Sequence, residues 1–227
     1  MEIKRQFIEG EGFHVPCVFL RPPRRSGTRG PAGAAVIVPG YGGSKEEFLG
    51  LAWRVAELGF DTCVIDLRGH GEHQLSLDHD ILRDVETAIG FCRRDHQKVV
   101  AIGHSMGGRL ALLSSADAVI AISPAYSKTY CAQTHAYIRK MESHRVREPS
   151  TETVFQILER LPLWRPTDGR RVAVIYGSRD NYDTIRSCEE LRAAGVPVTL
   201  IDKALHGDSF LFEETFRAIK KELARFG

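Results

Sequence analysis

The pattern Gly-x-Ser-x-Gly around Ser105 constrains the fold of this chain more than any other feature of its sequence. A short run of small and β-branched apolar residues, 99–102, precedes the pattern, and a helix-forming segment, 109–116, follows it. Between a strand and a helix, such a serine stands at the tip of a sharp turn. The turn places Ser105 in an unfavourable backbone region, and side chains at Gly103 and Gly107 would clash with neighbouring elements.

The helix expected after Ser105 gives this turn a chemical property. The first N–H groups of a helix have no partner within it, and the positive end of its dipole points toward the serine. Negative charge that develops on a substrate oxygen would be stabilised there. The turn therefore predicts a reactive site.

Apolar, strand-like runs alternate with amphipathic segments along most of the chain. We expect strands at 3–8, 13–20, 34–39, 61–67, 99–102, 119–123, 171–176 and 196–201, and helices at 44–59, 77–94, 109–116, 182–194 and 208–226. This alternation predicts an α/β fold with a mostly parallel central sheet and helices on both faces. The length of 227 residues is that of a single domain.

The segment 124–168 interrupts this alternation, because it holds no convincing strand. Its apolar residues indicate two helices, one carrying Tyr126, Tyr130, Tyr137, Ile138 and Met141, the other opening at 149–152 and carrying Val154, Phe155, Ile157, Leu158 and Leu161. We expect the two helices to form a short cap over the site. The alternative is that they pack on the rim of the sheet as additional core.

Reactive side chains follow the later strands of the predicted sheet. A serine hydroxyl needs a base to take its proton, and the base needs a third group to orient it. Of nine histidines, His206 alone follows the last expected strand. Asp180 follows the strand before it, whereas Asp183 and Asp208, the alternatives, resemble ordinary first-turn helix residues. Strand ends of a parallel sheet meet at one edge, so Ser105, Asp180 and His206 are the expected catalytic residues.

Five segments carry a resemblance to a known family: Gly-Tyr-Gly-Gly at 40–43, Asp-Leu-Arg-Gly-His-Gly at 66–71, Gly-His-Ser-Met-Gly-Gly at 103–108, Gly-Ser-Arg-Asp at 177–180 and Leu-His-Gly at 205–207. The chain resembles the α/β-hydrolase superfamily over nearly its whole length, and looks most like its small serine esterases and acyl hydrolases. The resemblance implies an α/β-hydrolase fold, with Ser105 as nucleophile, Asp180 as acid and His206 as base. It also implies that the backbone N–H groups of Tyr41 and Met106 form the oxyanion hole.

The sequence departs from the family pattern at one position. The first glycine motif usually begins with His-Gly, and here it begins with Pro39-Gly40. That position supports the loop rather than the reaction, so we expect Pro39 to alter the loop geometry without abolishing activity.

The resemblance implies hydrolysis of a carboxylic ester or thioester through an acyl-enzyme, with no metal and no organic cofactor. Because the expected cap is short, we expect a substrate of small to medium size. A peptidase or lyase on the same scaffold is an alternative, and so is a protein that binds a ligand without catalysis. The expected cap predicts that Tyr130, Tyr137, Phe155 and Trp164 border the substrate. Tyr41, one of the expected oxyanion donors, is a further expected substrate contact.

Two further motifs suggest a nucleotide-binding loop and a zinc site, but neither has the spacing that such a site requires. The segment 40–45 follows a strand, but it lacks the third glycine of a dinucleotide-binding loop. The run His-Gly-Glu-His at 70–73 fits neither common zinc spacing. We expect Asp66 and Arg68 to fix this loop through charged hydrogen bonds.

Composition narrows the range of partners and compartments. The net charge of +2 gives no reason to expect nucleic acid or an acidic membrane as partner. The five cysteines are scattered, without a Cys-x-x-Cys pair, so we expect buried free thiols and a reducing compartment. No apolar run approaches membrane-spanning length, and the first residues lack the core of a signal peptide. We therefore expect a cytoplasmic protein.

Overall fold

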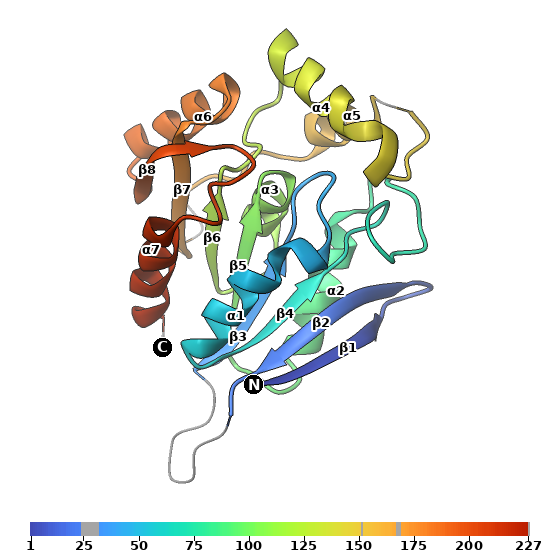
Figure 1. The fold of residues 1–227 in the computed structure, drawn as a ribbon, viewed down its shortest axis with the longest axis vertical. Coiled ribbons are helices and arrows are strands. Elements are labelled where there is room, and N and C mark those ends of the chain that lie inside the picture. The colour runs from blue at the N-terminus through green and yellow to red at the C-terminus, as the bar shows by residue number, and fades with distance from the viewer. Residues whose placement is uncertain (24–31, 151, 167–168, 227) are drawn as a thin grey trace.

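A computed structural model describes residues 1–23, 32–150, 152–166 and 169–226, with the backbone alone at 141–144. One sheet of eight strands forms the centre of the molecule, and helices cover both of its faces (Figure 1). Two further helices lie beyond the end of the sheet where the parallel strands finish (Figure 1). The prediction of an α/β-hydrolase fold with a mostly parallel sheet is confirmed.

The strands are β1 (Glu2–Glu9), β2 (His14–Arg21), β3 (Gly33–Val38), β4 (Phe60–Ile65), β5 (Val99–His104), β6 (Ala118–Ile122), β7 (Arg171–Arg179) and β8 (Val198–Leu205). Their order across the sheet is β1-β2-β4-β3-β5-β6-β7-β8. The first two strands form an antiparallel hairpin, β2 also pairs antiparallel with β4, and every other neighbouring pair is parallel. The parallel strands are almost entirely buried from β3 to β6, as their continuous apolar runs require.

The helices are η1 (Lys45–Phe48, a 3₁₀ turn), α1 (Leu49–Glu57), α2 (Leu82–Cys92), α3 (Met106–Leu113), α4 (Ala132–Arg145), α5 (Thr153–Arg160), α6 (Tyr182–Ala193) and α7 (Glu213–Ala224). One core cluster joins α1 and α7 to one face of the sheet, and a second joins α2, α3, α5 and α6 to the other. The helices expected from residues 77 and 208 begin later, at Leu82 and Glu213, because irregular turns precede both.

The two helices within 124–168 are α4 and α5, and residues 151, 167 and 168 of that range lie outside the described residues. Tyr126 and Tyr130 precede α4, so their assignment to this helix was wrong. The hydroxyl of Tyr126 donates to the carbonyl of Trp164, and that of Tyr130 donates to the carbonyl of Ala125. These two bonds fix the chain in an irregular path before the helix starts.

A buried arginine holds both ends of this insertion to the helix that follows Ser105. Arg109, on α3, is fully buried and donates to the carbonyl oxygens of Ala125, Leu161 and Pro162. Burial lowers the pKa of Arg109. The guanidinium satisfies backbone carbonyls far apart in the sequence, which explains its burial.

The loop after β4 is fixed by charged hydrogen bonds, as predicted for Asp66 and Arg68. The buried ammonium of Lys45 lies 2.6 Å from Asp66 and 2.9 Å from Glu72. Burial alone would lower the pKa of Lys45, but the neighbouring carboxylates outweigh it and raise the pKa. Lys45 lies two residues after the glycine-rich segment 40–43, so this ion pair ties the chain after that segment to the end of β4.

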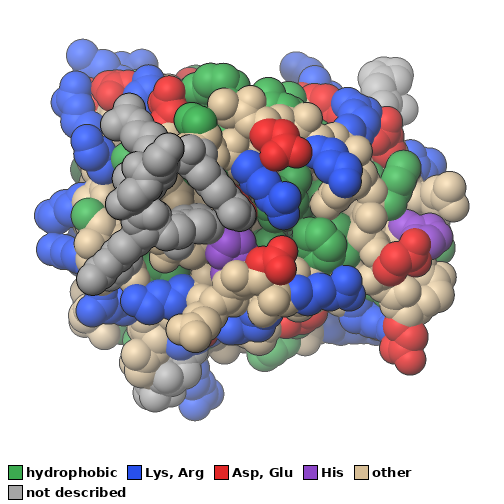
Figure 2. Space-filling view, turned by 90° about the horizontal axis from the view of Figure 1, so that it is seen from below, with side chains coloured by type: hydrophobic (Ala, Val, Ile, Leu, Met, Phe, Trp, Pro, Cys, Tyr) green, Lys and Arg blue, Asp and Glu red, His purple; other side chains and the backbone are tan. Residues whose placement is uncertain are grey.

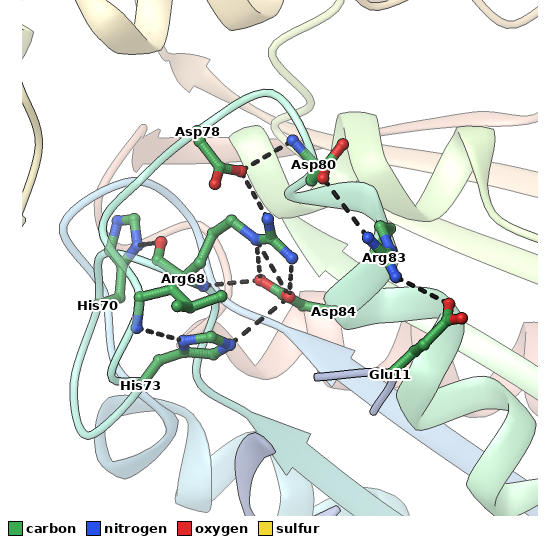
Figure 3. A network of polar contacts seen from close by, with 9 residues as sticks. Glu11, Arg68, His70, His73, Asp78, Asp80, Arg83 and Asp84 are labelled. Atoms are coloured by element: carbon green, nitrogen blue, oxygen red, sulfur yellow. Dashed lines mark hydrogen bonds and ion pairs between the residues drawn. The ribbon is translucent and has the colours of Figure 1, made fainter. Parts of the chain in front are cut away.

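Figure 3 shows a second network in the same loop. Arg68 lies 2.9 Å from the buried Asp84 of α2 and 2.6 Å from Asp78. The Nδ1 atom of His70 lies 3.0 Å from the carbonyl oxygen of Arg68, and His73 lies 3.5 Å from Asp84 (Figure 3). The run His-Gly-Glu-His thus contributes its imidazoles to the packing of this loop.

The end of the molecule opposite α4 and α5 bears charges of both signs. Figure 2 shows Lys and Arg side chains lying among Asp and Glu side chains on this face, with hydrophobic side chains between them. This mixture agrees with the small net charge of +2.

The substitution Lys45→Met should lower the free energy of unfolding by about 3–5 kcal/mol, because it leaves Asp66 buried without its cation. Chemical denaturation of the purified variant measures the change. Glu152→Gln is the matched control, because the Arg139–Glu152 pair is exposed and its loss should cost at most about 1 kcal/mol. Equal effects of the two substitutions would contradict this assignment.

The stability of the protein should fall as the pH drops below about 6.5, in part because of His70. Burial, the largest effect, lowers the pKa of His70 to about 4, so below its ordinary value of 6.5 the unfolded chain binds a proton that the folded chain does not. Between pH 7 and pH 5 this should cost about 2 kcal/mol. Denaturation at both pH values measures it.

His70→Asn keeps an N–H donor near the carbonyl of Arg68 and removes the titrating group. The variant should therefore lose less stability than the parent protein over the same interval. An identical loss in both proteins would show that His70 does not titrate on unfolding.

Candidate active site

The turn between β5 and α3 has the strained conformation that its sequence predicts. Ser105 adopts φ 53° and ψ −118°. A Cβ atom on Gly103 would lie 2.2 Å from the carbonyl oxygen of Gly107, and one on Gly107 would lie 2.2 Å from the carbonyl oxygen of Val38. Only glycine fits at these two positions, and the serine is held at the tip of the turn.

The structure brings the three expected catalytic side chains together. The Oγ atom of Ser105 lies 2.9 Å from Nε2 of His206, and Nδ1 of His206 lies 2.7 Å from Oδ1 of Asp180. Ser105 directly follows β5, Asp180 directly follows β7 and His206 directly follows β8. Each distance is that of a hydrogen bond, so the arrangement can pass a proton from the hydroxyl to the imidazole.

The surroundings of Asp180 favour its ionised form. Burial would raise its pKa, but the neighbouring His206, together with a hydrogen bond from the backbone N–H of Asn181, lowers it below its usual value. An ionised Asp180 accepts the Nδ1–H of His206, which leaves Nε2 as the acceptor that faces Ser105. This tautomer is the one that a general base requires.

The two alternative acids have other partners. Asp183 accepts hydrogen bonds from the backbone of Cys131 and the hydroxyl of Thr134, so it connects α6 to the start of α4. Asp208 accepts a hydrogen bond from the backbone N–H of Leu205. Both carboxylates therefore stabilise local structure.

The two residues expected to supply oxyanion donors lie beside Ser105. Gly40 approaches the serine so closely that a Cβ atom on it would lie 3.0 Å from Cβ of Ser105. Tyr41 follows Gly40, and Met106 is the first residue of α3, whose N–H has no partner within the helix. Both residues line the cavity next to the serine, where N–H groups can stabilise negative charge.

A cavity of about 470 Å³ opens onto Ser105 and His206. Its apolar lining includes Phe48, Ile138, Val154, Leu158, Phe210 and Leu211. An ion pair between Glu47 and Arg145, with an N–O distance of 2.8 Å, lies among the lining residues. A cavity of this size and polarity suits a small organic molecule.

The predicted substrate contacts fall into two groups. Tyr41, Tyr130 and Tyr137 line the cavity, and the ring of Tyr137 lies 6.3 Å from that of His206. Phe155 and Trp164 are buried in the core and are absent from the cavity lining, which corrects their prediction as contacts. Phe155 stacks on His135 of α4 instead.

His104 is a further residue of the site, which the sequence did not single out. Its Nε2 atom lies 2.8 Å from the carbonyl oxygen of His206, and its ring lies 5.2 Å from the ring of His206. Burial, together with the neighbouring charge of His206, lowers the pKa of His104 to about 3. The only sequence feature that could have indicated a role for His104 is its position directly before Ser105.

Within the described residues, no three or more His, Cys, Asp or Glu side chains are grouped so that they could hold a metal ion. In the same part of the chain, no helix is both long and apolar enough to cross a membrane. All five cysteines are free thiols, and all but Cys131 are buried.

Comparison with known proteins extends these observations. A thermostable monoacylglycerol lipase from Bacillus sp. (strain H-257) is 33% identical over 87 residues, which are 37% of this chain and 34% of the lipase. The match thus spans about a third of that relative.

Solved structures share the fold. A carboxylesterase structure from Nitrososphaera gargenis superposes with a TM-score of 0.74 at 16% identity, covering 97% of this chain and 98% of the other. A soluble variant of monoglyceride lipase from Saccharomyces cerevisiae gives 0.75 at 15% identity, covering 99% and 96%. At such identities the likeness establishes the fold alone.

The model of the alpha/beta hydrolase family matches residues 35–225, which include every strand from β4 to β8 and most of β3. The chain belongs to the α/β hydrolase family.

Proposed function

We propose that this protein hydrolyses carboxylic esters of small to medium size through an acyl-enzyme on Ser105. The observation that carries the proposal is the chain of two hydrogen bonds, 2.9 Å and 2.7 Å long, from Ser105 through His206 to Asp180. The family and the esterase and lipase names among the similar proteins support an ester as the substrate.

In the first half of the reaction, His206 takes the proton of Ser105 as the oxygen attacks the ester carbonyl. The backbone N–H groups of Tyr41 and Met106 donate to the oxyanion of the tetrahedral intermediate, and the dipole of α3 adds to this stabilisation. The buried carboxylate of Asp180 stabilises the imidazolium. His206 then protonates the leaving alcohol.

In the second half, His206 activates a water molecule that attacks the acyl group on Ser105. The same oxyanion donors act again, and the serine is regenerated. In this proposal α4 and α5 form a cap, and α4 contributes Tyr137 and Ile138 to the wall of the cavity that receives the substrate.

Ser105→Ala should reduce kcat for a p-nitrophenyl ester by about 10⁴-fold or more, because the covalent intermediate can no longer form. Steady-state assays of the purified variant measure this loss. Ser115→Ala is the control, since Ser115 contacts Glu86 on the surface, and it should retain full activity. Substantial turnover by the Ser105 variant would contradict the proposal.

Esters with short to medium acyl chains should be hydrolysed fastest, because a cavity of about 470 Å³ is near the lower end of the range for small-molecule sites. A series of p-nitrophenyl esters from acetate to palmitate measures kcat/KM against chain length. Highest activity on palmitate would show that the acyl chain does not bind within this cavity.

A further inference from the structure

The base of the proposed mechanism lies in a segment without regular structure. Residues 206–212 form turns between the end of β8 and the start of α7. Strand pairing therefore ends before His206, and other bonds must hold its main chain. The carbonyl oxygen of His206 accepts two hydrogen bonds from side chains, at 2.8 Å from Nε2 of His104 and at 3.4 Å from Oγ of Ser209.

The shorter of these bonds comes from the neighbour of the nucleophile. His104 is the last residue of β5 and directly precedes Ser105. Two consecutive residues therefore supply the reactive hydroxyl and the N–H that bonds to the loop 206–212, which carries His206. Because a carbonyl oxygen only accepts, Nε2 of His104 must carry the proton. This nitrogen therefore donates its proton to a backbone carbonyl and does not act as a second base.

The position of the His104 ring is closely determined. It is buried, and its ring lies 5.9 Å from that of Phe48 and 5.0 Å from that of Phe210. On a further side, a Cβ atom on Gly40 would lie 3.0 Å from Nδ1 of His104. The ring is thus enclosed by the glycine-rich segment 40–43, by η1 and by the loop 206–212.

We propose that His104 is a positioning residue, whose Nε2–H bond to the His206 carbonyl keeps the imidazole of His206 within hydrogen-bonding distance of Ser105. The inference rests on the proposed function, since it assigns His206 as the base. His104 stays uncharged while His206 gains a proton, because burial keeps its pKa near 3, so it adds no repulsion to the imidazolium.

The test compares His104→Gln with His104→Met. Both side chains are unbranched and similar in length, but only glutamine carries an N–H donor. His104→Met should lower kcat for a p-nitrophenyl ester about 10- to 100-fold, because a displacement of about 1 Å in a reacting group costs this much. KM should change less than about threefold, and His104→Gln should recover most of the lost kcat.

Two results would overturn the inference. In the first, His104→Met keeps kcat within about twofold of the parent protein. In the second, His104→Gln is as slow as His104→Met although both variants melt near the parent temperature. If His104→Met does not fold, His104→Phe takes its place, because it keeps a ring beside Phe48 and Phe210 and also lacks the donor.

A fluorophosphonate probe separates this inference from the proposed function. The parent protein should be labelled on Ser105, and His104→Met should be labelled more slowly by the same factor as its loss of kcat. A parent protein that is not labelled overturns the proposed function and the inference with it. Equal labelling rates for the parent and His104→Met overturn the inference alone.

Discussion

The close approach of backbone to backbone at the turn after β5 is the constraint on which the rest of the structure depends. Gly103, Gly107 and the carbonyl of Val38 lie so near one another that no side chain fits between them. This contact joins the ends of β5 and β3 to the first turn of α3 and holds Ser105 in its strained conformation. It also directs the N-terminus of α3 at the serine, so one packing contact determines both the position of the hydroxyl and the electrostatic field around it.

The other parts of the site lie on irregular segments, which buried polar side chains hold in place. The Lys45–Asp66 ion pair fixes the chain after the glycine-rich segment 40–43. Arg109 bonds to both ends of the insertion 124–168, and His104 bonds to the loop 206–212. Each of these side chains bonds to a segment that is distant in the sequence, and polar groups that are buried without hydrogen bonds are costly. The precision of the site therefore comes from a few long-range polar contacts added to a regular sheet.

The sequence was sufficient to predict what depends on local pattern. Apolar runs and their alternation predicted the sheet and the order of its helices, and the glycines around Ser105 predicted a turn without room for side chains. Contacts between distant segments were not predictable in this way. Tyr126 and Tyr130 have helical spacing but lie outside α4, where their hydroxyls bond to backbone carbonyls, and Phe155 is buried against His135 of α4. Arg109 donates to carbonyl oxygens of residues 52 and 53 positions away in the sequence, and no local sequence pattern predicts these hydrogen bonds.

If Ser105 is the nucleophile, its hydroxyl carries the acyl group during turnover. Mass spectrometry of the protein, quenched in acid during hydrolysis of p-nitrophenyl acetate, detects this intermediate. We expect one added acetyl group, mapped by proteolysis to the peptide that contains Ser105, which disappears when the substrate is exhausted. An acetyl group on another residue, or turnover without any acylated protein under conditions where deacylation limits the rate, would contradict it.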